Sequence, residues 1–368
     1  MPSERASIAD RRTRAAATLR ERRLSALLIS PGADLFYLTG YQIFASERLT
    51  CLVLDADGTA TIVCPEFEAP RVAVGAPDIA RSTWGETDDP YAVVAALVRA
   101  PGVVAVADQM WAAFFLKLQA ALPGRSFAVS SEITRGLRMR KDSAEVEALR
   151  LVSESADRAY ARILERPFAG RTEREIGADL ADFLRAEGHD EVGFTIVGSG
   201  ANGASPHHEA GDRRIGEGDT IVLDFGGGMR GYRSDITRTV HVGKTAGREE
   251  QKVHDVVRQA QEAGYTAARK NASAESVDQA ARGVIDDAGY GQFFIHRTGH
   301  GIGLDGHEHP YLVSGNRERL EPGMAFSIEP GIYLPGRFGV RIEDVAVIDA
   351  DGSARPLNRA DHSFATVA

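Results

Sequence analysis

Residues 219–242 read DTIVLDFGGGMRGYRSDITRTVHV. The pattern predicts two strands joined by a glycine-rich turn, with one inward-facing carboxylate on each strand, Asp224 and Asp235. Two like charges buried close together are unfavourable unless a cation lies between them. The stretch therefore predicts half of a two-metal site. For this hairpin taken alone, the alternative is a pair of surface aspartates beside a turn.

The second half of the site is expected downstream, in three further stretches. Residues 296–310, HRTGHGIGLDGHEHP, hold four of the ten histidines of the chain. Residues 324–333, MAFSIEPGIY, and residues 339–345, GVRIEDV, each predict an apolar strand that ends in, or contains, a glutamate, Glu329 or Glu343. A glutamate in an apolar strand needs either a buried partner or a solvent-exposed edge, and both alternatives stay open for each glutamate alone.

Together these stretches supply an oxygen-rich set of side chains. The predicted metal ligands are Asp224, Asp235, His300, Glu329 and Glu343. Four carboxylates balance the charge of two divalent cations, and this donor set suits Mn²⁺, Co²⁺ or Mg²⁺ better than a thiolate zinc site does. Two metals bridged by carboxylates form a common centre of metal-dependent hydrolysis.

The length of 368 residues predicts two domains. The first part alternates apolar strands with helices, which predicts a small N-terminal α/β domain over residues 1–135. The expected elements are strands at 24–30 and 103–108, a hairpin at 49–64, and helices at 91–100 and 111–122. No glycine-rich strand-to-helix turn accompanies them in the sequence, so no nucleotide site is expected there.

Residues 142–368 predict a second domain with a weak internal repeat, and the polar, basic residues 130–141 separate it from the first. Long helices at 142–165 and 249–269 each lead into a second helix and then into strands. Capping boxes mark two helix starts, Asp142 with Glu145 and Thr172 with Glu175. Two similar halves indicate a pseudo-symmetric α+β domain whose strands could enclose a site.

The composition excludes several classes of function. A net charge of −9 disfavours a nucleic-acid partner, and 43% hydrophobic with 26% charged residues is ordinary for a globular protein. The sequence contains no run of about 18 apolar residues, so no membrane span is expected. The charged N-terminus lacks the apolar segment of a secretory signal. The two cysteines, Cys51 and Cys64, favour a reducing cytoplasm, with a disulfide across the hairpin as the alternative.

Four motifs resemble those of the metallopeptidase family that includes Xaa-Pro dipeptidase (prolidase), aminopeptidase P and methionine aminopeptidase. The motifs are LDFGGGMRGYRSDITRTV, HRTGHGIGLDGHEHP, FSIEPGIY and GVRIEDV. The resemblance covers the whole second domain, and the additional N-terminal domain is similar to the Xaa-Pro branch. It implies the pseudo-symmetric pita-bread fold for the second domain and a homodimer as the assembly.

The resemblance also implies roles for the predicted ligands. Asp224 would hold one metal, Asp235 and Glu343 would bridge both metals, and His300 and Glu329 would complete the second. Mn²⁺ is the expected metal, with Co²⁺ or Zn²⁺ as alternatives. A water acidified by both metals would attack the scissile carbonyl, and Glu329 would shuttle its proton.

Further residues match family positions near the substrate. His207, in NGASPHH, would lie beside the substrate, and His307 would steady the tetrahedral intermediate. His296 would lie near the pocket, and Arg341 would orient groups of the site. Two other histidines have no such counterpart and are expected at the surface or behind the site, His208 and His309.

The resemblance implies cleavage of the peptide bond before proline, with Xaa-Pro dipeptides preferred as substrates. Aminopeptidase P activity on longer Xaa-Pro peptides, and hydrolysis of a C–N bond in another small metabolite, are the alternatives. A catalytically silent binding module fits less well because the ligand set is complete. A nucleotide-binding protein fits least, because GHGIG lacks the Lys-Ser/Thr of a phosphate-binding loop.

A dipeptidase must also bind the free carboxylate that follows proline, and arginine is the simplest partner. Arg48, in GYQIFASERLT, is predicted to do this because it lies in the segment where the N-terminal domain of the family approaches the site. It could reach into the site of a neighbouring subunit. A solvated surface arginine is the alternative.

Overall fold

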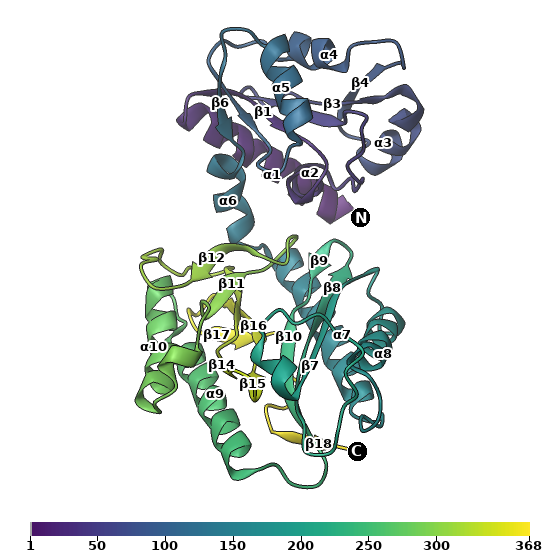
Figure 1. The fold of residues 1–368 in the computed structure, drawn as a ribbon. Coiled ribbons are helices and arrows are strands. Elements are labelled where there is room, and N and C mark those ends of the chain that lie inside the picture. Colours follow the sequence, from purple (N-terminus) through teal and green to yellow (C-terminus); the bar gives the residue numbers. More distant parts are fainter. Residues whose placement is uncertain (1) are drawn as a thin grey trace. The chain divides into compact units, whose positions relative to one another are not determined.

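Two regions of the chain build separate hydrophobic cores. The computed structural model describes residues 2–368, with side chains from Ser7 onward, and divides into the units Met1–Arg138 and Met139–Ala368 (Figure 1). The first core gathers on one sheet, around residues such as Leu28, Val104 and Phe114. Three further clusters pack between the helices and strands of the second unit. Of the described helices, none combines the length and apolar character needed to cross a membrane.

The N-terminal unit is a six-stranded mixed sheet in the order β4-β3-β2-β1-β5-β6, with helices packed around it. Its strands are β1 Leu24–Ile29, β2 Cys51–Asp55, β3 Ala60–Pro65, β4 Ala80–Trp84, β5 Val103–Val106 and β6 Ser126–Val129. Its helices are α1 Pro2–Glu21, α2 Ala33–Thr39, η1 Glu66–Glu68, α3 Ala69–Gly75, α4 Pro90–Leu97, α5 Ala112–Ala121 and α6 Ser131–Met139. The predicted strands, hairpin and helices are therefore confirmed.

Two details of this unit bear on the expectations above. Both cysteines are buried and free, so the hairpin of β2 and β3 is held by its ladder alone and not by a disulfide. The stretch at 130–141, expected as the separation between domains, is mostly the helix α6, and the division between the two units falls within it.

The second unit repeats the order helix, helix, strands, as predicted. The first half contains α7 Ser143–Ile163, α8 Glu173–Ala186, β7 Glu191–Ser199, η2 Gly200–Ala204, β8 Thr220–Met229, β9 Tyr232–Arg233 and β10 Ile236–Val242. The second half contains α9 Arg248–Ala267, α10 Ala274–Asp287, η3 Gly291–Phe293, β11 Gly299–Gly301, β12 Glu308–Leu312, β13 Ala325–Ile328, β14 Gly331–Leu334, β15 Phe338–Arg341 and β16 Asp344–Ile348. The chain ends with β17 Ala354–Pro356 and β18 Ala365–Val367.

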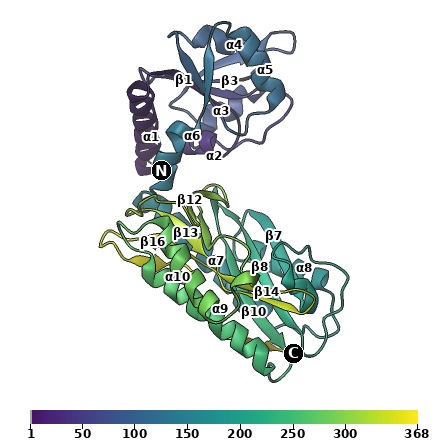
Figure 2. The ribbon, with the colours of Figure 1, turned by 60° about the vertical axis from the view of Figure 1, so that its left-hand side comes forward.

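Each half of this unit has its own sheet. One sheet has the order β18-β10-β8-β7, with β9 paired to β8, and the other has the order β12-β11-β13-β16-β17. α9 and α10 lie side by side along the second half (Figures 1 and 2). Both predicted capping boxes are present, at the starts of α7 and α8. The two sheets face the region where the predicted ligands gather.

The glycine run in the metal hairpin is not its turn, which corrects the prediction. Residues 226–228 lie inside β8, and the turn is formed by Arg230 (φ 53°) and Gly231 (φ 88°). A Cβ on the first glycine of the run would lie 2.1 Å from the carbonyl oxygen of Ser234, and one on the second 2.2 Å from that of Glu191. The glycines therefore let the neighbouring backbone approach β8 closely, right beside the two aspartates.

Each of the two predicted glutamate stretches forms two strand segments, with the glutamate between them. Glu329 lies between β13 and β14, and Glu343 lies between β15 and β16. β13 pairs with β16, and β14 pairs with β15, so the four segments form one antiparallel hairpin that bends between two sheets. Both glutamates lie at the bend, which places their side chains together.

We expect the Gly226→Ala substitution to lower the free energy of unfolding by about 1–3 kcal/mol, because the added Cβ meets a backbone carbonyl that cannot turn aside. Urea unfolding of the chelated protein, followed by circular dichroism, measures this change. Gly283→Ala, in α10 with no heavy atom within 4 Å of the new Cβ, is the control and should raise stability by about 0.5–1 kcal/mol. Equal stability of Gly226→Ala and the parent would contradict the close approach.

Candidate metal centre

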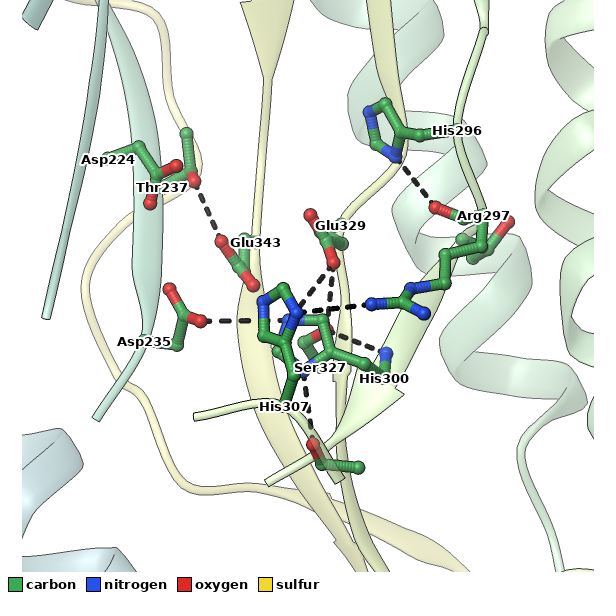
Figure 3. Close-up of polar contacts among 12 residues, drawn as sticks. Asp224, Asp235, Thr237, His296, Arg297, His300, His307, Ser327, Glu329 and Glu343 are labelled. Carbon is green, nitrogen blue, oxygen red and sulfur yellow. Dashed lines mark hydrogen bonds and ion pairs between the residues drawn. The ribbon is translucent and has the colours of Figure 1, made fainter. Parts of the chain in front are cut away.

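All five predicted ligands converge between the two sheets of the second unit (Figure 3). Their ligand atoms lie within 4.8 Å of one another in three overlapping groups, which are Asp224, Asp235 and Glu343; His300, Glu329 and Glu343; and Asp235, His300 and His307. The first half of the unit supplies both aspartates, and the second half supplies the histidines and glutamates. The internal repeat thus places one part of the cluster on each half.

Two carboxylate oxygens of this cluster lack the hydrogen-bond partners that buried charges require. Within the part of the chain that the structure describes, Asp224 Oδ1 and Glu343 Oε1 are buried without a hydrogen-bond partner. Burial and the neighbouring carboxylates raise the pKa of Asp235 and that of Glu343 far above their ordinary values. Burial also raises the pKa of Glu329 to about 7. Cations between these oxygens would relieve both the burial and the repulsion, so the residues fit a pair of divalent metals.

His300 is arranged as a neutral metal ligand. Its Nδ1 lies 3.1 Å from the carbonyl oxygen of Gly301, so Nδ1 carries the proton and Nε2 keeps its lone pair. Nε2 points to the carboxylates, 3.3 Å from Glu329 Oε1 and 3.7 Å from Asp235 Oδ2. Burial lowers the pKa of His300 to about 3, which keeps the imidazole available to a cation.

A buried arginine organises the cluster from behind. Arg341 Nη2 donates to Asp224 Oδ2 (2.5 Å), Nη1 donates to the hydroxyl of Tyr333 (2.6 Å), and Nε donates to Thr237 Oγ1 (3.1 Å). Thr237 Oγ1 in turn donates to Glu343 Oε2 (2.8 Å). One guanidinium thus connects carboxylates from both halves of the unit.

Tyr333 and Thr237 had not been predicted as parts of the site. Thr237 could have been found, since it shares a strand face with Asp235 by the alternation of side chains. Tyr333 follows the bend at Glu329. In the pairing of β14 with β15 it lies opposite Gly339, two residues from Arg341, and this pairing brings its hydroxyl within reach of the guanidinium. The sequence carries no local signal for that contact.

The cluster forms the floor of a cavity of about 710 Å³, a volume suited to a small peptide. Predicted substrate residues line it, namely His207, His296, His307 and Arg341. Apolar side chains stand at its rim, where Phe194 is 36% and Ile295 66% exposed. The cavity therefore combines a charged floor with an apolar mouth.

The histidines of the cavity have specific partners. His296 Nε2 lies 2.7 Å from the hydroxyl of Tyr333, and burial lowers the pKa of His296 to about 4. Arg297 Nη2 donates to His307 Nδ1 (3.1 Å), so the proton of the neutral His307 ring sits on Nε2. Burial lowers the pKa of His307 as well. Arg297 is a further cavity residue that the sequence had not singled out.

The remaining predicted residues lie elsewhere. Arg48 belongs to the N-terminal unit, where its Nε donates to Glu86 Oε1 (3.0 Å) and its side chain also pairs with Glu47. The two histidines without a family counterpart lie outside the cavity lining, as His208 contacts Glu173 and His309 packs on Tyr311.

Comparisons with known families agree with this geometry. Residues 147–350 match Metallopeptidase family M24, and residues 11–140 match the Creatinase/Prolidase N-terminal domain. The chain is 44% identical over 358 residues to the probable dipeptidase PepE of Mycobacterium tuberculosis, covering 96% of this chain and 95% of the relative. It is 36% identical over 340 residues to the Xaa-Pro dipeptidase of Lactobacillus helveticus, covering 88% and 90%.

Solved structures show the same likeness across both units. The dipeptidase PepE of Mycobacterium ulcerans superposes with a TM-score of 0.93 at 43% identity, covering 98% of each chain. An X-Pro aminopeptidase from Thermotoga maritima superposes with a TM-score of 0.86 at 30% identity, covering 97% of this chain and 99% of that one. The two-domain fold with a pita-bread second domain is thereby confirmed.

The raised pKa of Glu329 gives the metal-free protein a characteristic pH dependence. The folded state keeps a proton between the ordinary value of 4.5 and about 7, whereas the unfolded state loses it. The contribution of this group to stability is therefore present below pH 4.5 and is lost as the pH rises through 7, at about 1.4 kcal/mol for each pKa unit.

We expect denaturant unfolding of the chelated protein to show stability falling between pH 4.5 and about pH 7. Glu329→Gln should flatten this slope, and Glu165→Gln, at an exposed position of the same unit, should leave it unchanged. Added Mn²⁺ should stabilise the parent most at pH 8, because metal binding requires deprotonated carboxylates. A steeper fall of stability with pH in Glu329→Gln than in the parent would refute the assignment of this pH dependence to Glu329.

Proposed function

We propose that this chain, which belongs to metallopeptidase family M24, hydrolyses the peptide bond preceding proline in Xaa-Pro dipeptides. The observation that carries the proposal is the convergence of three buried carboxylates, the partly buried carboxylate of Glu329 and one neutral imidazole on a cavity of about 710 Å³. Relatives that match nearly the full chain, named dipeptidase PepE and Xaa-Pro dipeptidase, support the substrate class.

The proposed metal ligands are the five converging residues. Asp224 would hold one metal, Asp235 and Glu343 both metals, and His300 and Glu329 the second. Mn²⁺ is the proposed metal, with Co²⁺ or Zn²⁺ as alternatives, because oxygen donors dominate the set. When bound, two such cations polarise a scissile carbonyl and acidify a water molecule.

Two protein groups are proposed to move or donate protons. The carboxylate of Glu329 accepts a hydrogen bond from Ser327 Oγ (3.2 Å), which fixes its orientation, and we assign it as the proton shuttle. His307 carries its proton on Nε2, the nitrogen not occupied by Arg297, so it can donate to an oxyanion at the scissile carbon. His207 and His296 are proposed to contact the substrate, and Arg341 to orient Asp224.

The preference for proline follows from the chemistry of the bond. A peptide bond that precedes proline is a tertiary amide without an N–H group. A site that acts on the carbonyl does not need to hold that hydrogen. In a Xaa-Pro dipeptide the proline carries a free carboxylate. Arg48 of a neighbouring subunit in a homodimer is proposed to bind this carboxylate.

The cellular setting and the domain roles are proposals of the same kind. Residues 142–368 are proposed as the catalytic domain, and residues 1–135 as the domain that contributes to substrate selection. Two free, buried cysteines support a reducing cytoplasm as the location. The net charge of −9 disfavours nucleic acid as a partner.

The central prediction is metal-dependent cleavage of a Xaa-Pro dipeptide by the purified protein. With Mn²⁺, release of free proline from Leu-Pro should exceed release of the N-terminal residue from Leu-Pro-Gly, and exhaustive chelation should abolish both. Preferred cleavage of the tripeptide would identify an aminopeptidase P instead. No cleavage of either peptide with metal present would remove the proposed function.

A second prediction concerns Arg48. Loss of a charge-assisted hydrogen bond worth roughly 1.5–3 kcal/mol should raise KM for Leu-Pro about 10- to 100-fold in Arg48→Ala. KM for Leu-Pro-Gly should change little, because its carboxylate lies one residue further on. Arg99→Ala, at another exposed arginine of the same unit, is the control. An unchanged KM for Leu-Pro would exclude this role of Arg48.

A further inference from the structure

A fully buried carboxylate outside the metal cluster holds the loop that carries His207. Glu173 is the first residue of α8 and is 0% exposed. Its oxygens accept hydrogen bonds from Ser199 N (2.8 Å), Ser199 Oγ (2.6 Å), Asn202 Nδ2 (3.0 Å), His208 Nε2 (2.7 Å) and Gly211 N (3.2 Å). The donors all belong to one segment, residues 199–211.

This arrangement keeps the buried carboxylate ionised. Burial alone would raise the pKa of Glu173, but hydrogen bonds from Ser199, His208 and Asn202 outweigh it and lower the pKa. The N-terminus of α8 adds a favourable partial charge. The hydrogen bonds from residues 199–211 thus stabilise the charged carboxylate of Glu173, and the same bonds fix the position of this segment.

The segment links Glu173 to the cavity by two contacts. His207 lies in the cavity lining, one residue before His208. The carbonyl oxygen of Pro206 accepts a hydrogen bond from Arg341 Nη2 (3.2 Å), the same guanidinium that donates to Asp224. The carboxylate therefore binds the two ends of a loop whose middle touches the catalytic machinery.

Glu173 itself is remote from that machinery. It does not belong to the cavity lining, and its nearest described partners are the loop residues themselves. It acts on the cavity through the loop, whose residues Ser205, Pro206 and His207 line the cavity, and His207 is the one next to the bound His208. The bond from His208 fixes the backbone at the adjacent position.

We propose that Glu173 and His208 are positioning residues, which hold the loop of residues 199–211 so that His207 meets the substrate. The inference rests on the proposed function, in which His207 contacts the peptide. It assigns a role to His208, for which the family resemblance gave none, and to Glu173, which the sequence had not singled out.

Two substitutions separate charge from shape. Glu173→Gln keeps the volume but turns one acceptor oxygen into an NH₂ group, which faces other donors of the loop. His208→Ala removes one donor at a partly exposed position, whereas His208→Gln retains an N–H donor and should restore most of the loss. We expect Glu173→Gln and His208→Ala to lower kcat/KM for Leu-Pro roughly 10- to 100-fold, chiefly through KM.

A double-mutant cycle tests the route of the effect. If Glu173 acts through His207, then Glu173→Gln added to His207→Ala should cause no further loss of kcat/KM. A loss that multiplies that of His207→Ala would overturn the proposal. Mn²⁺ affinity, measured by calorimetry, should stay unchanged in Glu173→Gln, and a weakened affinity would likewise overturn it.

Hydrogen exchange by mass spectrometry supplies a readout that needs no activity. Peptides covering residues 199–211 should exchange faster in Glu173→Gln and in His208→Ala, but not in His208→Gln. Glu145→Gln is the matched control, because Glu145 is a buried carboxylate at the start of α7 that accepts from Asp142 N (3.0 Å) and Tyr232 Oη (3.0 Å). It should change neither the exchange of this loop nor KM.

The two failures are distinguishable. If the parent protein cleaves no Xaa-Pro peptide, the proposed function fails, while the exchange measurement still tests whether Glu173 orders the loop. If the parent is active and Glu173→Gln keeps both the protection of the loop and the parental KM, the positioning role fails alone.

Discussion

Repulsion among four closely spaced carboxylates, three of them buried, is the constraint on which the rest of the second unit depends. Charges of one sign within a few ångströms of one another are stable only with cations between them or with protons on some of them. The raised pKa values of Asp235, Glu329 and Glu343 express this in the metal-free protein. A flexible backbone would simply move the side chains apart, so the fold must oppose that movement.

Buried arginines and closely packed backbone segments oppose the separation of the carboxylates. Arg238, 1% exposed, donates from Nη1 to the carbonyl oxygen of Glu343 (2.7 Å) and from Nη2 to Asp344 Oδ1 (2.7 Å). Its Nε also donates to the carbonyl oxygen of Asp361 (3.0 Å), which ties the C-terminal segment to the same strands. On the opposite face Arg341 holds Asp224. Arg341 thus holds one carboxylate directly, Arg238 holds the backbone at Glu343, and the glycine run lets the strands lie close together.

Much of the site could be predicted because the types of its residues alone indicate metal binding. Four acidic side chains in apolar surroundings and a histidine among glycines indicate a metal site before any contact is known, and all five converge. Local patterns also predicted the helix starts, since a capping box involves only neighbours within one turn. The glycine run was misjudged because its partners, Ser234 and the carbonyl oxygen of Glu191, become visible only once three strands are paired.

Other features could not be predicted for related physical reasons. The breaks at Glu329 and Glu343 leave the apolar pattern unchanged, because both arms of the bent hairpin are buried. The network of Arg341, Tyr333 and Thr237 joins residues up to 104 positions apart, and no periodicity encodes such a contact. The binding of the loop by Glu173 is equally non-local, since its sequence signature is that of an ordinary first helical turn.

The same geometry separates the chemistry of cleavage from the choice of peptide length. The cations act on a carbonyl group, which every peptide presents, so they cannot distinguish a dipeptide from a longer chain. That choice requires a positive charge one residue beyond the scissile bond. The arginines that line the cavity are already engaged, Arg341 with Asp224 and Tyr333, and Arg297 with His307 and the ring of Tyr311. A carboxylate would have to displace one of these partners or meet a cation from outside the cavity, and only the second route leaves the catalytic groups in place.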